Sequence, residues 1–332
     1  MADSDKVQGE AAIIQEFLAP LAAGFPGAFG LLDDCAAFTP APGHDLVVKT
    51  DPVAAGVHFF ADDPAVDIAW KALAVNVSDL VAKTAVPRAY LMALSFPGAP
   101  TRAWMRDFAT GLGEAQTAFG LHLVGGDTDQ RSGPLTISIT VLGEVPTGTM
   151  LRRGTAQAGD LVCVTGVLGD AALGLALHTG ALSGVQLGLP HRDTSGLIRR
   201  YLRPQPDLAH VPLLRRHARA AMDISDGILK DLGRMCAASS VGAELRAERL
   251  PVSTAAQIAF KTRPDLFAAM ISAGDDYEVL AAVPPEQFAA FQQAAPHGLT
   301  CIGTFTAGSS VIMRGPDGQP VDFAGNTGWD HF

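Results

Sequence analysis

The chain has 332 residues, of which 48% are apolar and 17% charged, and its formal net charge is −10. This length predicts about two domains, and the apolar content excludes a largely disordered chain. The negative charge argues against direct binding to nucleic acid or to an anionic membrane. Four widely spaced cysteines, with no Cys-x-x-Cys pair, argue against a zinc site or a disulfide scaffold. The polar start shows no signal-peptide pattern and no apolar run is long enough to span a membrane, so we expect a cytoplasmic enzyme.

The first half of the chain is predicted to alternate helices and strands. Apolar residues at three- and four-residue spacing predict helices, and short β-branched or alternating runs predict strands. In chain order we expect a helix over 11–23, a strand over 45–51, a helix over 65–85, a strand over 88–96, a helix over 102–119, a strand over 121–124 entering Gly125-Gly126, and a strand over 135–145.

The second half begins after a composition shift over 146–154, which predicts domains 1–146 and 147–332. Here we expect a strand over 160–165, a helix over 170–178, a long irregular excursion over 181–206, a helix beginning after Gly227, and strands near 279–283 and 301–305. Strands and helices mixed in both halves indicate a two-domain α/β (α+β) protein.

Acidic residues recur where predicted strands end or helices begin. Six clusters do so: Asp33-Asp34, Thr50-Asp51, Asn76-Val-Ser-Asp79, Asp127-Thr128-Asp129, Asp223-Ile-Ser-Asp226 and Asp275-Asp276. Any one of them has an ordinary interpretation as a turn or a helix cap, and Ser225 or Asp226 is an obvious cap for the helix that follows. If several converge, their mutual repulsion calls for cations, and an all-oxygen donor set favours magnesium over zinc. The sequence therefore predicts metal-dependent chemistry on phosphates.

Other phosphate signals are weaker. Gly125-Gly126 would let the main chain approach a phosphate, although a tight turn explains the pair equally. The P-loop and dinucleotide-binding patterns are missing from the sequence. Arg152 and Arg153 suit either a phosphate clamp or a solvated linker, and His58 suits either a packed histidine or a substrate contact.

Taken in order, the clusters belong to a longer set of motifs. The set comprises Asp33-Asp34-Cys-Ala, Lys49-Thr-Asp-Pro-Val-Ala-Ala-Gly-Val-His-Phe59, Lys71-Ala-Leu-Ala-Val-Asn-Val-Ser-Asp79, Gly125-Gly-Asp-Thr128, Met222-Asp-Ile-Ser-Asp-Gly-Ile-Leu-Lys-Asp-Leu-Gly233, Gly274-Asp-Asp-Tyr-Glu278 and Gly328-Trp-Asp-His-Phe332. Over nearly its whole length the chain resembles the thiamine-monophosphate kinase family, whose superfamily includes aminoimidazole ribonucleotide synthetase and selenophosphate synthetase.

This resemblance implies a fold, a partner and a reaction. The fold would be two α/β domains, with the N-terminal sheet pairing with that of a second copy to form a β-barrel across a homodimer. The reaction would be direct transfer of a phosphoryl group from ATP to thiamine monophosphate, which gives thiamine diphosphate. Such transfer depends on positioning and charge neutralisation more than on covalent catalysis.

The resemblance also implies roles for individual residues. Magnesium ions would be held by Asp34, Thr50, Asp51, Asp79, Asp127, Asp223 and Asp226. ATP would be contacted by Gly126, Asp127, Arg153 and Ser225, and thiamine monophosphate by His58, Asp275 and Trp329.

Three departures from the family pattern bear on the site. Leu32 replaces the second glycine of Gly-x-Gly-Asp-Asp and lacks the freedom of glycine to adopt positive φ. Asp275 replaces a glutamate and is one methylene shorter. Lys49 stands where a small hydroxyl is common, and as a strand residue two places from Asp51 it should face the same side. Its ammonium would then supply positive charge where relatives with a hydroxyl could bind an additional magnesium ion; alternatively, Lys49 is a solvated lysine on a strand that has already turned.

Two other functions remain open at this point. One is another ATP-dependent enzyme of the superfamily with a different acceptor, such as a formylglycinamidine or selenide. The other is a catalytically silent nucleotide-binding scaffold. ADP production with magnesium and thiamine monophosphate separates them.

Overall fold

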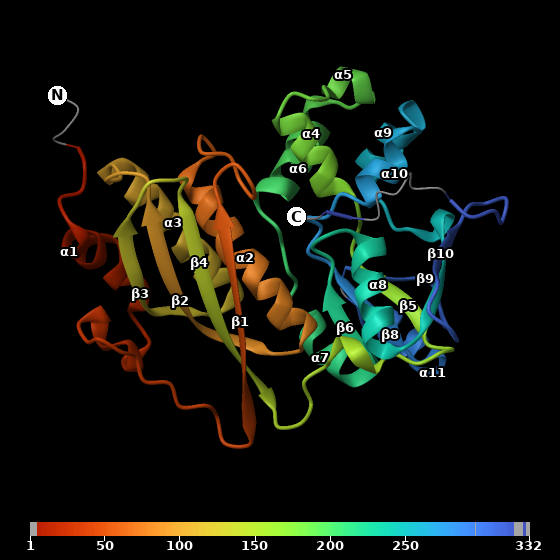
Figure 1. The fold of residues 1–332 in the computed structure, drawn as a ribbon, viewed down its shortest axis with the longest axis horizontal. Helices are drawn as coiled ribbons and strands as arrows, with labels where there is room; N and C mark the ends of the chain where they lie inside the picture. The colour runs from red at the N-terminus through yellow and green to blue at the C-terminus, as the bar shows by residue number, and fades with distance from the viewer. Residues whose placement is uncertain (1–4, 296, 322–327, 330–332) are drawn as a thin grey trace. The chain divides into compact units, whose positions relative to one another are not determined.

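The computed structural model describes residues 5–295, 297–321 and 328–329, which form two compact α/β units (Figure 1). The first unit runs to Leu80 and includes Ala85–Gly148, and the second comprises Val81–Thr84 and the described residues from Thr149 onward. Within these described ranges, no helix is long and apolar enough to cross a membrane.

The first unit is built on a four-stranded sheet in the order β1-β4-β2-β3, with α2 and α3 on one face (Figure 1). Strand β4 runs antiparallel to both β1 and β2, whereas β2 and β3 are parallel. Its elements are α1 (Glu10–Ile13), a π-helical turn (Ile14–Leu18), 3-10 turns (Ala19–Ala22 and Pro26–Leu31), β1 (His44–Ala54), α2 (Ala65–Ala82), β2 (Val86–Phe96), α3 (Arg102–Phe119), β3 (His122–Gln130) and β4 (Thr136–Pro146).

Alternation along β4 shows how the sheet divides its residues between two faces. Ile137, Ile139 and Val141 are fully buried, while Ser138 and Thr140 between them are only half-buried. Successive side chains of a strand point to opposite faces, so one face of this sheet is apolar core and the other is accessible.

Helix α3 occupies the range predicted from its periodicity. Thr101 caps its start by accepting a hydrogen bond from the Trp104 N–H at 3.1 Å, and Gly120 ends it in the left-handed conformation. Threonine at the N-cap and glycine after the last turn are common local signals, and they explain why the sequence located both ends.

The continuous helix predicted over 11–23 is wrong. The segment is split into α1, a π-helical turn and a 3-10 turn whose first positions include Pro20. Proline has no N–H to donate and its ring crowds the preceding turn, so a regular α-helix does not continue through it.

The strand predicted over 121–124 is too short, because β3 continues through Gly125-Gly126 to Gln130. The glycine pair is therefore part of a strand, not of a turn. A Cβ on Gly126 would lie 1.8 Å from the Met92 carbonyl oxygen of β2, and the residue has a φ of 155°. Glycine at this position lets β2 and β3 pair closely.

The second unit contains a six-stranded sheet in the order β10-β7-β9-β5-β8-β6, parallel at the β10-β7 pair and antiparallel elsewhere. Its elements are a 3-10 turn (Arg153–Thr155), β5 (Leu161–Thr165), α4 (Asp170–His178), α5 (Gly184–Leu187), α6 (His191–Leu202), α7 (His210–His217), β6 (Ala220–Asp223), α8 (Ile228–Ser239), β7 (Gly242–Arg246), a 3-10 turn (Ala247–Arg249), α9 (Thr254–Thr262), α10 (Leu266–Ile271), β8 (Val279–Val283), α11 (Pro285–Ala294), β9 (Leu299–Thr306) and β10 (Val311–Arg314).

Two apolar clusters hold this unit together. Leu232 and Met235 of α8 pack with Val162 and Leu280 of the sheet in the larger cluster. A smaller cluster joins α4, α5, α6 and α9 through residues such as Leu173 and Leu197.

The irregular excursion predicted over 181–206 instead contains α5 and α6. Ser183 begins α5 with a capping box, and α6 buries Leu197 and Tyr201 on one face. Gly188 and Pro190 are residues typical of loops, and they led to the wrong prediction. In the structure Gly188 ends α5 and Pro190 directly precedes α6.

Candidate functional site

Lys49 connects two of the carboxylates predicted to be metal ligands. Its Nζ lies 2.9 Å from Oδ2 of Asp51 and 2.8 Å from Oδ2 of Asp79. Lys49 and Asp51 are two residues apart on β1 and share a face, whereas Asp79 comes from α2. The predicted orientation of Lys49 toward Asp51 is confirmed.

The charge state of this cluster follows from its surroundings. Burial opposes the charge of Lys49, but Asp79 and Asp51 outweigh it and raise the pKa of the ammonium above its usual range. Burial also raises the pKa of Asp51, and the hydrogen bond from Lys49 offsets part of that rise. Lys49 is thus a fixed positive charge among the carboxylates.

Thr50 and Asp51 point to opposite faces of β1, because adjacent strand residues alternate. The Thr50 hydroxyl accepts a hydrogen bond from Thr140 at 3.0 Å and donates to the Ile139 carbonyl at 3.1 Å. The Asp51 N–H donates to Oδ1 of the buried Asn76 of α2 at 2.9 Å. The structure therefore separates these two neighbouring side chains and fixes the Asp51 backbone from α2.

A cavity of about 780 Å³ in the first unit brings other predicted residues together. Asp33, Asp34 and Asp127 line it, with Gly126 beside them. The apolar wall includes Phe25 and Phe38, whose rings are stacked with centroids 6.0 Å apart. Its volume lies within the range of about 300–1,000 Å³ usual for small-molecule sites. The cavity thus offers aromatic rings suited to a planar apolar group and carboxylates suited to cations bound to a polyanion.

The loop before Asp33 does not need glycine at position 32. Leu32 has a φ of −105° and is exposed, so the expected conflict with positive φ does not arise there. The left-handed residues are instead Phe29, Gly30 and Leu31. Two of these three are not glycines, so the strain falls before Leu32.

The His58 side chain contacts the end of β1, the strand that precedes it in the chain. Its Nδ1 accepts a hydrogen bond from the Ala54 N–H at 3.1 Å, which places the proton of a neutral ring on Nε2. Its charged form would lower the pKa of Asp51, so the imidazole lies within electrostatic reach of that carboxylate.

In the second unit, the predicted residues Ser225 and Asp226 belong to a loop held by Asp231. Oδ2 of this fully buried aspartate accepts hydrogen bonds from the backbone N–H groups of Ser225 at 3.0 Å and Asp226 at 2.9 Å. Asp223 ends β6 just before the loop and is buried.

The predicted helix cap at Ser225 or Asp226 is wrong. The N-cap of α8 is Gly227, without a side-chain cap. Asp226 instead forms an ion pair with Arg234, which also binds Asp231 at 2.8 Å. The motif from Met222 to Gly233 contains Asp231, but its residue pattern does not indicate this role; the position of Asp231 in the first turn after Asp-Gly is the signal in the sequence.

Asp275 lies in a loop that pairs with the Ser225 loop. Its N–H donates to the Ser225 carbonyl at 2.9 Å, and Oδ1 accepts a hydrogen bond from the Tyr277 hydroxyl at 3.1 Å. Asp275 and Tyr277 both have positive φ, at 62° and 51°. Such strained conformations concentrate at functional sites, and here they belong to two residues of one predicted motif, on either side of Asp276.

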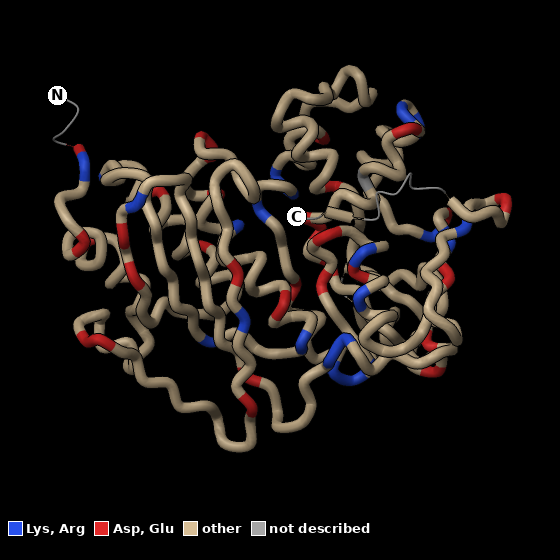
Figure 2. Tube along the Cα trace, in the orientation of Figure 1, with Lys and Arg blue, Asp and Glu red and all other residues tan. Residues whose placement is uncertain are grey.

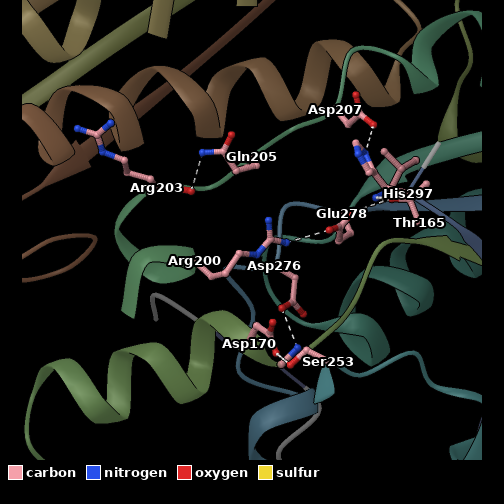
Figure 3. A network of polar contacts seen from close by, with 12 residues as sticks. Thr165, Asp170, Arg200, Arg203, Gln205, Asp207, Ser253, Asp276, Glu278 and His297 are labelled. Atoms are coloured by element: carbon pink, nitrogen blue, oxygen red, sulfur yellow. Dashed lines mark hydrogen bonds and ion pairs between the residues drawn. The ribbon is translucent and has the colours of Figure 1, made fainter. Parts of the chain in front are cut away.

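Beneath this loop lies a polar network that the sequence did not indicate (Figure 3). Glu278 accepts hydrogen bonds from Arg200 at 2.9 Å and Thr165 at 2.8 Å. Asp276 Oδ1 accepts one from the Gly169 N–H at 2.8 Å, while Oδ2 has no hydrogen-bond partner among the described residues. Burial raises the pKa of Asp276 well above its usual value, so this carboxyl is neutral over a wider pH range.

Trp329 is attached to the same part of the second unit through its backbone. Its N–H donates to the Asp226 carbonyl at 2.9 Å, and its own carbonyl accepts a hydrogen bond from Lys230. The side chain is 51% exposed. The remaining residues of the terminal motif, 330–332, lie outside the described residues.

Arg153 lines a second cavity, of about 340 Å³, in the second unit together with Lys83 and Arg152. Its carbonyl accepts a hydrogen bond from Ser239 at 3.0 Å. The three cations give this cavity a positive wall, which is suited to an anion.

Acidic residues recur through both units (Figure 2), yet no three Asp, Glu, His or Cys side chains in the described ranges are grouped closely enough to hold a metal ion. The available donors are hard oxygens, and Asp33, Asp34 and Asp127 line the same cavity. That set fits magnesium, which commonly keeps several waters and uses one or two carboxylates.

Comparison with known proteins assigns the fold to a class. Residues 32–145 match the AIR synthase related protein, N-terminal domain, and residues 157–315 match the corresponding C-terminal domain. The two-domain α/β organisation described above is thus that of the AIR synthase related proteins.

The individual relatives are more specific. The chain is 39% identical to thiamine-monophosphate kinase of Caulobacter vibrioides, over 96% of this chain and 89% of that protein. A crystal structure of thiamine-monophosphate kinase from Stenotrophomonas maltophilia K279a superposes with a TM-score of 0.78 at 36% identity, covering 96% of this chain and 93% of the other. AaThiL complexed with AMPPCP and TMP superposes with a TM-score of 0.77 at 29% identity, covering 98% and 97%. The chain belongs to the thiamine-monophosphate kinase family.

Proposed function

We propose that this protein transfers the terminal phosphoryl group of ATP to thiamine monophosphate, producing thiamine diphosphate and ADP. The observation that carries the proposal is the 39% identity to a thiamine-monophosphate kinase over 96% of this chain. The similarity to AaThiL, solved with AMPPCP and TMP, supports both an ATP site and an acceptor site.

ATP would occupy the first-unit cavity. The base would pack on the apolar wall near Phe25 and Phe38, and the phosphates would lie toward Asp34 and Asp127. The Gly126 backbone at the same wall would let a phosphate approach closely. Their family motifs also make Arg153 and Ser225 proposed ATP contacts, Arg153 through its positive charge.

Magnesium would be held by the acidic set Asp34, Thr50, Asp51, Asp79, Asp127, Asp223 and Asp226. When bound, these ions would neutralise the phosphate charge that carboxylates alone would repel. The chain's own contribution is orientation: Asn76 fixes Asp51, and Asp231 fixes the loop that carries Ser225 and Asp226. Positioning of this kind is the main requirement of direct phosphoryl transfer.

Lys49 would supply positive charge in place of one magnesium ion. Its ammonium already bridges Asp51 and Asp79, so those two carboxylates have a positive partner without metal. An ammonium cannot coordinate a phosphate oxygen as a metal does, but it donates hydrogen bonds and is not lost on dilution.

Thiamine monophosphate would be bound by His58, Asp275 and Trp329. The exposed Trp329 indole offers a face for the cationic thiazolium, and cation–π attraction is worth about 0.5–2 kcal/mol. His58, whose Nδ1 accepts a hydrogen bond from the Ala54 N–H, would contact the acceptor phosphate.

The protein would act as a homodimer joined through the accessible face of the first sheet, whose strands would complete a barrel with a second copy. Exposed apolar residues outside the cavity support this: Leu46 (40%), Val48 (57%) and Val86 (50%). The pairing Leu46–Glu144–Val86 places residues of three strands in one row on that face. An apolar patch on a sheet is a candidate association surface. Light scattering should give a dimer, and Val48→Asp should give a monomer.

The deciding experiment is incubation of the purified protein with ATP, magnesium and thiamine monophosphate, with mass detection of products. Thiamine diphosphate and ADP should form in equal amounts, and a chelator should stop both. Nucleotide binding without ADP release would favour a silent scaffold. ADP release only with a formylglycinamidine or selenide would assign a different acceptor.

A further inference from the structure

Two cysteines that are distant in sequence are paired on neighbouring strands of the second unit. Cys163 lies in β5 and Cys301 in β9, and the antiparallel pairing matches them as partners next to a register shift between Val162 and Cys163. Opposed residues in antiparallel strands share a face and have Cα atoms about 4.5 or 5.5 Å apart. Both values fall within the range of about 4.4–6.8 Å that a disulfide requires.

The two thiols differ in exposure and in charge. Cys163 is fully buried, whereas Cys301 is half-buried. A hydrogen bond from the Cys163 thiol, with help from Arg249, outweighs burial and lowers the pKa of Cys301 to about 6. The same interaction raises the pKa of Cys163. The Cys301 thiol, which also donates a hydrogen bond to the Gly303 carbonyl at 3.4 Å, therefore ionises more readily than the Cys163 thiol, and it is the more accessible of the two sulfurs.

The other cysteines lack such a partner in the described residues. Cys35 is exposed on the cavity loop of the first unit, and Cys236 is buried in the α8 core, where burial raises its pKa to about 11. Both serve as internal controls. Cys35 is an exposed thiol without a neighbouring cysteine, and Cys236 is a buried thiol with a raised pKa.

We propose that Cys163 and Cys301 form a redox site that hydrogen peroxide converts reversibly to a disulfide. The Cys301 thiolate attacks one peroxide oxygen and breaks the O–O bond, which gives a sulfenic acid and, after protonation, one water. The Cys163 sulfur then attacks the sulfenic sulfur, and its proton leaves with the hydroxyl group as a second water. In total, two thiols and one peroxide give one disulfide and two waters, so two electrons pass from sulfur to oxygen.

The bridge would join strands that are already paired. The immediate neighbour is an advantage over an isolated exposed thiol, because it captures the sulfenic acid before further, irreversible oxidation. This inference goes beyond the proposed kinase reaction and does not depend on it.

The test uses the full chain carrying Cys35→Ser, which removes the exposed thiol. The protein is treated with hydrogen peroxide, alkylated in denaturant, and analysed by intact and peptide mass spectrometry. We expect the alkylated thiols to fall from three to one, a Cys163–Cys301 linked peptide, and full recovery after dithiothreitol. When Cys301→Ser is added to the same background, peroxide treatment should not reduce the number of alkylated thiols. When Cys236→Ser is added instead, the linked peptide should still form.

Two results would overturn the proposal. One is Cys301 accumulating as a sulfinic acid while Cys163 remains alkylatable, which would show that the second sulfur cannot reach the first. The other is equal peroxide reactivity of Cys301 and Cys236 in the folded protein. If Cys301→Ser folds poorly, Cys163→Ala provides the second variant: it should convert the reversible product at Cys301 into an irreversible one.

Discussion

The ammonium of Lys49 lies 2.8 Å from the carboxylate of Asp79, which joins strand β1 to helix α2 by an ion pair within the predicted metal-binding set. A second carboxylate, that of Asp51, completes the contact at 2.9 Å. Because the lysine and the metal ions compete for the same oxygens, the metal requirement of this chain should depend on Lys49.

Lys49→Thr should increase the number of divalent ions bound. Removing the ammonium leaves Asp51 and Asp79 without their fixed positive partner, and a cation then relieves their repulsion. We expect Mn²⁺ titration, followed by electron paramagnetic resonance with a non-hydrolysable ATP analogue, to show additional bound metal per chain. The magnesium dependence of the rate should also steepen. Lys261→Thr, at the exposed end of α9, is the matched control. The same metal count in both variants would show that Lys49 only pairs charges.

Asp51→Asn and Asp127→Asn should remove activity while keeping the fold. Loss of a metal ligand should exceed the 10–100-fold effect typical of residues that support ligands, so we expect a fall of more than about 100-fold. Burial already disfavours the charge of Asp51, and Asp127 is exposed, so neutral amides should change unfolding free energy by less than about 1 kcal/mol. Metal-free thermal melts measure this, with the exposed Asp62→Asn as control. A large drop in melting temperature would make the carboxylate structural.

Trp329→Ala should raise the apparent KM for thiamine monophosphate more than that for ATP. Loss of a cation–π contact of about 0.5–2 kcal/mol corresponds to an increase of roughly 2- to 30-fold. Its backbone anchor to Asp226 is unaffected by the substitution, so the loss reports on the indole alone. Val185→Ala, at another exposed apolar residue, should leave both constants unchanged. Equal effects on both substrates would indicate that Trp329 has no preference for the acceptor.

Gly126→Ala should destabilise the first unit by about 3 kcal/mol or more, because the new Cβ would lie 1.8 Å from the Met92 carbonyl oxygen. Gly98→Ala introduces the same methyl where nothing lies within 4 Å, and should change stability by less than about 0.5 kcal/mol. Urea denaturation of both variants measures the difference. Equal stabilities would mean that β2 and β3 separate at little cost.

Asp276→Asn should stabilise the protein more at pH 7 than at pH 4. The raised pKa means that folded Asp276 binds its proton more tightly than unfolded Asp276, whose pKa is about 3.9. The folded state therefore binds more protons above pH 4, and stability falls as pH rises toward the folded pKa. Asparagine does not titrate, so the variant does not lose stability in this way as pH rises. Urea unfolding at pH 4 and pH 7 measures the change in stability that the substitution causes at each pH. If the exposed Asp62→Asn shows the same difference between the two pH values, the raised pKa of Asp276 is not its cause.

Much of the architecture followed from local signals in the sequence. Helix α3 begins after the Thr101 cap and ends at Gly120, and α4 and β8 occupy their predicted ranges. Caps, periodicity and alternation act over a few residues, so a single chain segment contains the information. The order of the acidic motifs likewise indicated the family, because that order is a property of the chain alone.

The tertiary structure decided which of these residues meet. The contacts of Lys49 with Asp79, of Asp231 with the Ser225 loop and of Cys163 with Cys301 join separate elements. The need for glycine at 126 arises from the backbone of a neighbouring strand, and no pattern around it reveals that approach. Strand register and helix packing set such contacts, and both depend on the burial of apolar faces far apart in the sequence. The sequence by itself therefore determined the kinds of residue available, and only the folded chain determined their partners.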